Sequence, residues 1–266
     1  MSVAIVIPAR YASTRYPAKP LVMLRGAGGN AKSLIQRSHE AASTVRGADH
    51  VYIATDDDRI AQAARDFGAQ VIMTPDSCAN GTERIAAAAP QLPQDADIIV
   101  NFQGDALLTP APLVEALIAH MQADPQCVCA TVAVRCSPSA YRHLVADQAA
   151  GRSGGTTAVC DETGNALYFS KRVLPFLPED RAERDCGKVL MHLGLYAYRR
   201  SALATYAALP PSFLEQVEGL EQLRFLGAGI KVHVVQADAP DWDTIELNNP
   251  SDVAPIEAIL QQRGLE

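Results

Sequence analysis

The chain has 266 residues and a formal net charge of −7, and 48% of its residues are hydrophobic. A protein of this length buries roughly 70 to 75% of its unfolded surface, so we expect one domain, or one domain with an elaboration. The acidic balance argues against nucleic acid, which would usually call for a broad basic face. No apolar run approaches the roughly 20 residues of a membrane span, and the start of the sequence has no signal-like cleavage site. We therefore expect a cytoplasmic protein without a membrane partner.

The six cysteines form no C-x-x-C pair, and no histidine stands at zinc-finger spacing. Cys127 and Cys129 alternate on an expected strand and so share one face, which would also suit two thiolate ligands. A reduced, packed pair is the interpretation that we favour.

The first residues combine an apolar run with a cationic loop. Val3–Ile7 is short and β-branched, as in a buried parallel strand, and we expect Pro8 to end it. The loop that follows carries Arg10, Arg15 and Lys19, and the first 39 residues contain no Asp or Glu. Exposed, solvated charges are the plain alternative. Three cations after a first strand favour one small polyanionic ligand.

The next hundred residues alternate between helical and strand patterns. We predict helices over 33–45 and 59–67 and after Arg84, and strands over 51–55, 70–74 and 97–103. The acidic run 56–58 could suggest a metal, but capping of the helix that follows explains it more simply. We expect Thr82 to cap the helix after Arg84. This alternation predicts an α/β fold with a three-layer core.

A glycine and an acid follow the most buried of these strands. In an open parallel sheet, ligands bind at the carboxyl ends of the strands, so Gln103-Gly104-Asp105 should reach the same edge as the cationic loop. Gly104 removes a side chain where another backbone or a ligand comes close. Asp105 supplies one hard oxygen, which is what Mg²⁺ on a triphosphate requires.

The pattern changes from about residue 128. Strand-like runs at 128–134, 166–170, 189–198 and 230–236 follow one another with irregular connections, and 151–157 reads as a mobile loop. We expect an added, partly antiparallel sheet region. The segment 215–226 has the apolar stripe of an amphipathic helix with solvated charges.

The opening segment P-A-R-x-x-S-T-R-x-P-x-K-P-L resembles the signature of the cytidylyltransferases that activate 3-deoxy-manno-octulosonate (Kdo). The resemblance runs from Val3 to about Ile259 and its motifs keep the family's order. It implies a Rossmann-like nucleotidyltransferase core of the nucleotide-diphospho-sugar transferase fold. It further implies a single domain over 1–266, with a nucleotide-binding half over about 1–125 and an acceptor-binding and dimerisation half over about 126–266. The relatives' role is in lipopolysaccharide biosynthesis, and a homodimer is expected by the same resemblance.

The resemblance also assigns nucleotide-binding residues. In the family the loop wraps the CTP triphosphate, and an S/N-G-T-E-R segment lies against the cytosine. The positions that carry these roles here are Ala9, Arg10, Ser13, Arg15, Lys19, Gly81, Thr82, Arg84 and Gln103.

Acceptor-binding residues come from two further motifs, M-H-L-G-L-Y-A-Y-R at 191–199 and L-E-Q-L-R at 220–224. Alternation along a strand would put residues 192, 194, 196 and 198 on one face, where they could hydrogen-bond a polyhydroxylated acceptor. Without the resemblance, a satisfied core histidine with aromatic packing would be preferred. The implied acceptor residues are Gln103, Lys171, His192, Tyr196, Glu221 and Gln222.

The sequence departs from the family's motifs at positions assigned to the metal and to the acceptor. An acid beside Asp105 is replaced by Ala106, and the second metal-binding Asp is replaced by Asn248, for which Glu246 could substitute. The Arg after Y-F-S is Lys171, a point charge in place of a bidentate fork. A family lysine is also absent from 154–158.

The resemblance implies an enzyme that transfers CMP from CTP to Kdo or a close sugar acid and releases pyrophosphate. The catalytic residues would be Lys19, Arg10, Arg15 and Asp105, with Mg²⁺ held by Asp105 and Asn248. Two alternatives stay open. One is CMP transfer to another acidic acceptor, such as a different ulosonic acid or a phosphonate. The other is a degenerate paralogue that binds nucleotide without turnover.

Overall fold

The computed structural model describes residues 2–12, 16–242 and 244–266. The chain forms two compact units, one of Met1–Ile118 with Pro240–Glu266 and one of Ala119–Ala239. The predicted halves divide at about residue 125, whereas the last segment of the chain here belongs with the first unit. The expectation of a single domain stays a prediction.

The first unit is built on four parallel strands: β1 (Ser2–Ala9), β4 (His50–Thr55), β5 (Gln70–Met73) and β6 (Ala96–Asn101). Their order is β6-β1-β4-β5, so β1 pairs with strands on both sides. Residues 3–7 are at most 1% exposed. Burial of both faces explains why this strand is a continuous apolar run rather than an alternating one.

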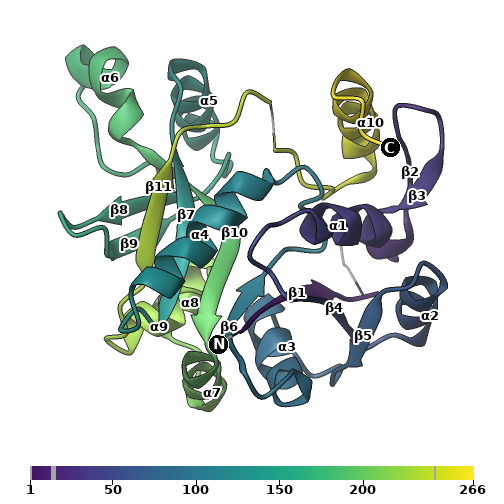
Figure 1. Cartoon of the computed structure of the whole chain (residues 1–266). Coiled ribbons are helices and arrows are strands. Elements are labelled where there is room, and N and C mark those ends of the chain that lie inside the picture. The colour runs from purple at the N-terminus through teal and green to yellow at the C-terminus, as the bar shows by residue number, and fades with distance from the viewer. Residues whose placement is uncertain (1, 13–15, 243) are drawn as a thin grey trace. The chain divides into compact units, whose positions relative to one another are not determined.

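Helices cover both faces of this sheet. They are α1 (Leu34–Ser43), α2 (Asp58–Asp66) and α3 (Gly81–Ala88), and Figure 1 shows α1 and α3 on opposite sides of the strands. A longer helix, α4 (Ala111–Ala123), follows β6. The predicted three-layer α/β core is therefore confirmed.

The helix starts test the capping predictions. The Asp57 carboxylate accepts a hydrogen bond from the Arg59 amide at 2.9 Å, so the acidic run before α2 is a cap as expected. The expected cap at Thr82 is wrong. α3 already begins at Gly81, and the side chain of Asn80 caps it by accepting from the Glu83 amide at 2.8 Å.

Strand β1 continues one residue past Pro8, which corrects the prediction that the strand ends there. Pairing of β1 with β6 stops at Val6, while Pro8 and Ala9 still pair with β4. Beyond Val6 one side of β1 has no ladder partner, so a residue without an N–H group is tolerated at that open side.

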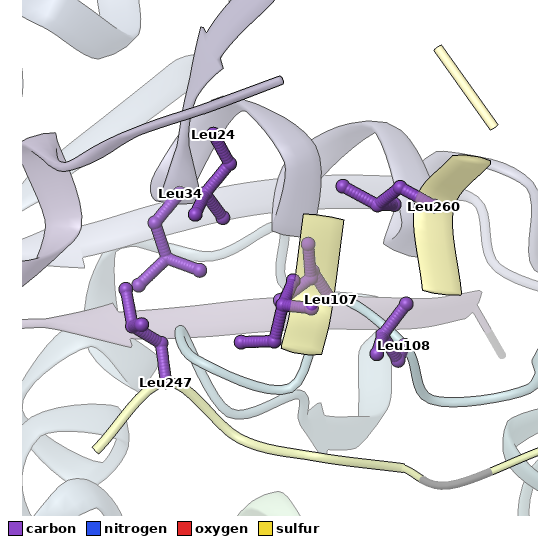
Figure 2. Packing of buried hydrophobic residues seen from close by; sticks show 7 residues of the cluster. Leu24, Leu34, Leu107, Leu108, Leu247 and Leu260 are labelled. Carbon is purple, nitrogen blue, oxygen red and sulfur yellow. The ribbon is translucent and has the colours of Figure 1, made fainter. Parts of the chain in front are cut away.

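A leucine-rich cluster joins the last residues of the chain to the first unit (Figure 2). Its members are Leu24, Leu34, Leu107, Leu108, Leu247, Ile256 and Leu260. The short 3-10 turn η1 (Lys19–Leu21) precedes a hairpin of β2 (Met23–Arg25) and β3 (Ala31–Ser33), and Leu24 lies in β2. Leu34 begins α1, Leu107 and Leu108 follow β6, and Leu247 precedes the short turn η4 (Pro250–Asp252). Ile256 and Leu260 lie in α10 (Val253–Gln262). The cluster fixes residues 247–260 against the elements that follow β1 and β6.

The second unit carries a mixed sheet. In it β7 (Cys129–Arg135) pairs antiparallel with β10 (Leu190–Arg199) and parallel with β11 (His233–Ala237). A hairpin of β8 (Thr157–Cys160) and β9 (Ala166–Ser170) adds to β10. The predicted partly antiparallel region is confirmed, although β8 was not predicted as a strand.

The helices of the second unit are mostly short. They are α5 (Pro138–Ala149), α6 (Glu179–Asp185), α7 (Arg200–Ala208), α8 (Phe213–Glu218) and α9 (Leu223–Gly227). The single helix predicted over 215–226 is wrong. Gly219 has a φ of +63°, which ends α8 in the left-handed conformation that glycine adopts without strain, so the segment forms two helices joined by a turn.

All six cysteines are free, and burial raises the pKa of Cys129 well above its ordinary value. Within the described ranges, no helix combines the length and apolar character needed to cross a bilayer.

A buried arginine ties α3 to the ends of two strands. The Arg84 guanidinium donates to Thr74 Oγ1 at 2.7 Å and to Asp56 Oδ2 at 3.2 Å, and its side chain is only 4% exposed. Asp56 follows β4 and Thr74 follows β5. The ion pair therefore fixes the first helical turn of α3 against the carboxyl edge of the sheet.

Replacing Arg84 should destabilise the protein. We expect Arg84→Ala to lower the free energy of unfolding by roughly 3 kcal/mol, because the Asp56 carboxylate would lose its charged partner in a poorly solvated place. Urea denaturation followed by circular dichroism measures this change. The matched control is Arg65→Ala, an exposed arginine of α2, which should stay within about 0.5 kcal/mol of the wild type. Equal stability of the two variants would contradict the assignment.

Candidate active site

A backbone hydrogen bond closes the loop after β1. The Ala18 amide donates to the Tyr11 carbonyl at 3.1 Å, and the Arg59 guanidinium lies 3.4 Å from the centre of the Tyr11 ring. Ala18 has a φ of +57°, a left-handed conformation that costs an L-residue about 1–2 kcal/mol. Arg10 is exposed at the start of the loop. Two predicted nucleotide-binding residues, Ser13 and Arg15, lie outside the described residues.

Lys19 and Asp105 form an ion pair across the carboxyl edge of the sheet. Lys19 begins η1 after the loop, and Asp105 follows β6. The Lys19 ammonium is bonded to Asp105 Oδ2, and the two side chains are 17% and 18% exposed. Parallel pairing of β1 with β6 brings the two segments together, so the prediction that they reach the same edge is confirmed.

Gly104 lies where two backbones approach each other closely. A Cβ atom at this position would be 2.6 Å from the Pro8 carbonyl oxygen, which is closer than real Cβ contacts. The Gly104 carbonyl in turn accepts from the Ser38 hydroxyl at 2.9 Å. The predicted close approach is confirmed, with the end of β1 as the neighbouring backbone.

The start of α3 lies beside the end of β6. A Cβ on Gly81 would be 3.5 Å from Asn101 Nδ2 and 3.7 Å from Gln103 Nε2, so these three residues are neighbours. Thr82 is 1% exposed, and Arg84 is held by its ion pair. Gly81 and Gln103 are thus brought together at the sheet edge, whereas the side chains of Thr82 and Arg84 point into the protein.

Asn101 is a polar residue that the sequence reasoning missed. It is the last residue of β6 and is fully buried, and neither atom of its carboxamide has a hydrogen-bond partner among the residues that the structure describes. A polar side chain directly after the apolar run Ile98–Val100 was the available signal.

A segment with two further oxygen-bearing side chains passes the backbone of Asp105. The Leu247 amide approaches the Asp105 carbonyl at 3.4 Å, and the burial of Leu247 in the leucine-rich cluster leaves its neighbours Glu246 and Asn248 half-buried beside this contact. Asn248 Nδ2 lies 3.4 Å from Glu246 Oε2. No three His, Cys, Asp or Glu side chains form a metal-binding group within 2–12, 16–242 and 244–266. One or two carboxylates with an amide fit Mg²⁺ that is held mainly by phosphates and water.

The second unit carries an aromatic row on β10. The ring of His192 lies 5.4 Å from that of Tyr196, and Tyr196 stacks on Tyr198 at 5.8 Å. The expectation that these three residues share one face is confirmed. The fourth expected residue, Gly194, lies in a two-residue bulge, because the register with β7 shifts between Leu193 and Tyr196. Two inserted residues preserve the alternation of the strand on either side of the bulge.

His192 is kept neutral by its surroundings. Its ring meets the edge of Phe169 at 5.0 Å, and desolvation lowers the pKa of His192 to about 3. Its Nε2 atom lies 2.9 Å from the hydroxyl of Thr131, a buried residue of β7. Thr131 is a further residue that sequence reasoning missed, because only strand pairing brings it to the histidine.

The remaining predicted acceptor residues surround the turn between α8 and α9. Glu221 and Gln222 form this turn, and Gln222 is 2% exposed. The Lys171 ammonium would lie 2.9 Å from a Cβ on Gly219, and the Lys171 amide donates to Glu218 Oε2 at 3.0 Å. Lys171 therefore lies against the start of the same turn.

A buried ion pair holds that turn in place. The Arg224 guanidinium donates to both carboxylate oxygens of Glu215, at 2.8 and 2.6 Å, and lies 4.1 Å from the centre of the Tyr206 ring. The Glu215 side chain also closes a capping box with Ser212. This network fixes the residues on both sides of Glu221 and Gln222. All predicted acceptor residues except Gln103 lie in the second unit, and the described nucleotide-binding residues lie in the first.

Sequence comparisons match this chain to one kind of enzyme. The family model described as Cytidylyltransferase matches residues 4–232. The chain is 41% identical over 265 residues to the 3-deoxy-manno-octulosonate cytidylyltransferase of Maricaulis maris, covering 99% of each chain. It is 40% identical over 268 residues to the 8-amino-3,8-dideoxy-manno-octulosonate cytidylyltransferase of Shewanella woodyi, covering 98% of this chain and 99% of the relative.

A solved structure extends the agreement to the fold. The structure of CMP:2-keto-3-deoxy-manno-octonic acid synthetase complexed with CTP is 34% identical and superposes with a TM-score of 0.84, covering 99% of this chain and 100% of that chain. The predicted fold class and the enzymatic character are confirmed. The parallel core with its cationic loop, the mixed sheet region and these relatives together establish that the chain belongs to the 3-deoxy-manno-octulosonate cytidylyltransferase family and is a CTP-dependent cytidylyltransferase.

Proposed function

We propose that the protein transfers CMP from CTP to Kdo or a close sugar acid and releases pyrophosphate. The observation that carries the proposal is the meeting of Lys19 and Asp105 at the edge where β1 and β6 end, because a triphosphate needs a cation and its metal needs an acid at one place. The substrates printed for the relatives support the choice of CTP and Kdo.

The reaction is a displacement at phosphorus. The anomeric hydroxyl oxygen of the acceptor forms a bond to the α-phosphorus of CTP, the bond from that phosphorus to the bridging oxygen of pyrophosphate breaks, and the hydroxyl proton leaves. No protein nucleophile is needed. Arg10, Arg15 and Lys19 would neutralise the triphosphate and the charge that grows on pyrophosphate. The Ser13 hydroxyl of the same loop would donate a hydrogen bond to the nucleotide.

Magnesium is the cofactor that we propose, with Asp105 and either Asn248 or Glu246 as its protein ligands. When bound, the ion would offset phosphate charge and polarise the α-phosphate. The Lys19 ammonium is bonded to the Asp105 carboxylate in the structure. When it binds the phosphates, Lys19 would turn from that carboxylate toward them.

Recognition of the two substrates is divided between the units. Backbone groups around Ala9 and Gly81, with the side chain of Gln103, would meet the nucleotide, and Thr82 and Arg84 would act by shaping this edge from inside. For the acceptor, we propose that Lys171 binds the carboxylate as a point charge and that His192, Tyr196, Glu221 and Gln222 meet the hydroxyl groups, with Gln103 as a shared contact.

A second acceptor that we propose as an alternative substrate is the 8-amino analogue of Kdo. The relative from Shewanella woodyi that is named for this acceptor is 40% identical, nearly as similar as the Kdo enzyme from Maricaulis maris. Another acidic acceptor, such as a phosphonate, and a nucleotide-binding paralogue without turnover are the remaining alternatives. The latter is motivated by the acids replaced at Ala106 and Asn248.

We also propose a homodimer formed through α8. This helix exposes three apolar side chains: Phe213 at 76%, Val217 at 68% and Leu214 at 38%. Their spacing puts them on one side of the helix, and apolar side chains gathered on a surface usually mark an interface. The free thiols suit the reducing cytoplasm, which is the location that we propose.

Pyrophosphate release across a panel of acceptors tests the reaction. With CTP and Mg²⁺, we expect release with Kdo, and a comparison of kcat/KM with the 8-amino analogue decides which acceptor is preferred. Lys19→Ala should abolish turnover, because the charge on the leaving pyrophosphate would no longer be balanced. The control is Lys231→Ala, an exposed lysine of the second unit, which should keep the wild-type rate.

Each result of the pyrophosphate assay leads to a different conclusion. Release only with another acid would replace the proposed acceptor, and retained CTP binding with no release from any acid would support the inactive paralogue. Near-normal rates for Lys19→Ala would remove this residue from the mechanism.

Magnesium titrations identify the second ligand. If Asn248 binds the ion, Asn248→Asp should lower the Mg²⁺ concentration for half-maximal rate several-fold, because a carboxylate compensates more charge than an amide. If Glu246 binds it, Glu246→Gln should raise that concentration by about tenfold. Asp241→Asn, at an exposed acid nearby in the sequence, is the control. Unchanged titrations for both ligand variants would exclude both residues.

Sedimentation velocity tests the homodimer. We expect the wild type to sediment as a dimer and the double variant Phe213→Glu, Val217→Glu to sediment as a monomer, because two carboxylates would be desolvated at each copy of the interface. Leu265→Glu changes an exposed leucine of α10's end and should leave the dimer intact. A wild type that sediments as a monomer at micromolar concentration would contradict the proposal.

A further inference from the structure

The bulge in β10 leaves one backbone carbonyl for a side chain to bind. Leu193 pairs with Val132 of β7, and the next pair is Tyr196 with Thr131, so Gly194 and Leu195 have no partners across the ladder. The Thr131 hydroxyl oxygen lies 2.7 Å from the Leu195 carbonyl oxygen. The hydroxyl therefore lies within hydrogen-bond distance of a bulge carbonyl, and the Leu193 carbonyl is farther away at 3.5 Å.

The same hydroxyl oxygen also contacts His192, and a count of protons decides the direction of each bond. A threonine hydroxyl has one proton to donate. Leu195 offers only an acceptor at 2.7 Å, and two oxygens at that distance without a proton between them would repel each other. The hydroxyl proton must therefore point to Leu195. The contact of 2.9 Å with His192 Nε2 is then a bond in which the nitrogen donates.

We propose that Thr131 is a positioning residue that holds His192 in the tautomer protonated at Nε2 and so presents the lone pair of Nδ1 as a hydrogen-bond acceptor for the sugar acid. The substrate contact rests on the proposed function, whereas the tautomer follows from the protein's own geometry. Across the described ranges, no group pairs with Nδ1, and this atom is not among the buried unpaired ones.

The surroundings of the ring support a fixed orientation. The His192 amide donates to the Thr156 carbonyl at 2.8 Å, which anchors the backbone on the side away from Thr131. Phe169 and Tyr196 pack against the ring. The ring thus has one polar contact within the protein, and that contact sets which nitrogen carries the proton.

A neutral imidazole can accept a hydrogen bond at its unprotonated nitrogen, here Nδ1. Desolvation keeps the pKa of His192 at about 3, so the ring stays uncharged at neutral pH. A lone pair at Nδ1 selects a donor group such as a hydroxyl and disfavours a carboxylate at the same place. Thr131 would therefore help to orient the acceptor, with its hydroxyl groups toward His192 and its carboxylate elsewhere.

Two variants of Thr131 separate this role from simple packing. Thr131→Ser keeps the hydroxyl and should keep both the tautomer and the kinetics. Thr131→Val keeps the shape but loses the group that receives the Nε2 proton. We expect its KM for Kdo to rise about tenfold, the value of one hydrogen bond to substrate, while its KM for CTP changes less than twofold.

Long-range ¹H–¹⁵N correlation spectra of the full-length protein, with the His192 signals assigned by comparison with His192→Gln, read the tautomer without any substrate. We expect protonated Nε2 in the wild type and in Thr131→Ser, and mixed tautomers in Thr131→Val. A wild type protonated at Nδ1 would overturn the proposal even if no variant folds. An unchanged tautomer and an unchanged KM for Kdo in Thr131→Val would also overturn it. The expected spectra without turnover of any sugar acid would support the positioning and reject the proposed function instead.

Discussion

The parallel pairing of β1 with β6 decides where this protein can do chemistry. The two strands are adjacent in the sheet but far apart in the sequence, so their carboxyl ends bring a cationic loop and an acidic turn to one edge. The glycine of that acidic turn, Gly104, allows its backbone to pass against the end of β1. Lys19 and Asp105 can then meet as an ion pair at this edge.

The second unit uses a different means to build a rigid polar surface. The proposed acceptor-binding residues lie on β10 and on the turn between α8 and α9, and buried polar contacts fix both. Arg224 with Glu215 fixes the turn of Glu221 and Gln222, and Thr131 fixes the bulge beside His192. Each contact leaves its buried partner satisfied, which is the condition for a polar network to make structure specific.

The sequence predicted the core strands well because each is an apolar run bounded by residues that stop a strand. It also predicted which segments share the reactive edge, since the order of parallel strands constrains where their ends lie. Local signals failed where a long-range contact or a single backbone conformation decided the outcome. Gly219 divided an apparently continuous helix, and Asn80 replaced Thr82 as a cap because α3 begins two residues earlier than a cap at Thr82 requires.

Much of the candidate site could be named from motifs, but its internal contacts could not. The approach of residues 246–248 to Asp105 depends on packing through Leu247, and the contact of Thr131 with His192 depends on the pairing of β7 with β10. The burial of Arg84 is likewise a tertiary effect, because the partners Asp56 and Thr74 follow two different strands. Pairings of this kind leave no periodic trace in one sequence.

The return of residues 240–266 to the first unit has a consequence for biosynthesis. The Ala27 amide donates to the Leu265 carbonyl at 2.8 Å, and Leu247 and Leu260 fill the cluster around Leu24. The ribosome releases the whole second unit before it releases these residues. The first unit is therefore translated first but can complete its folding only after residues 240–266 have been made. Until then the leucine-rich cluster lacks the part of its packing that these residues supply.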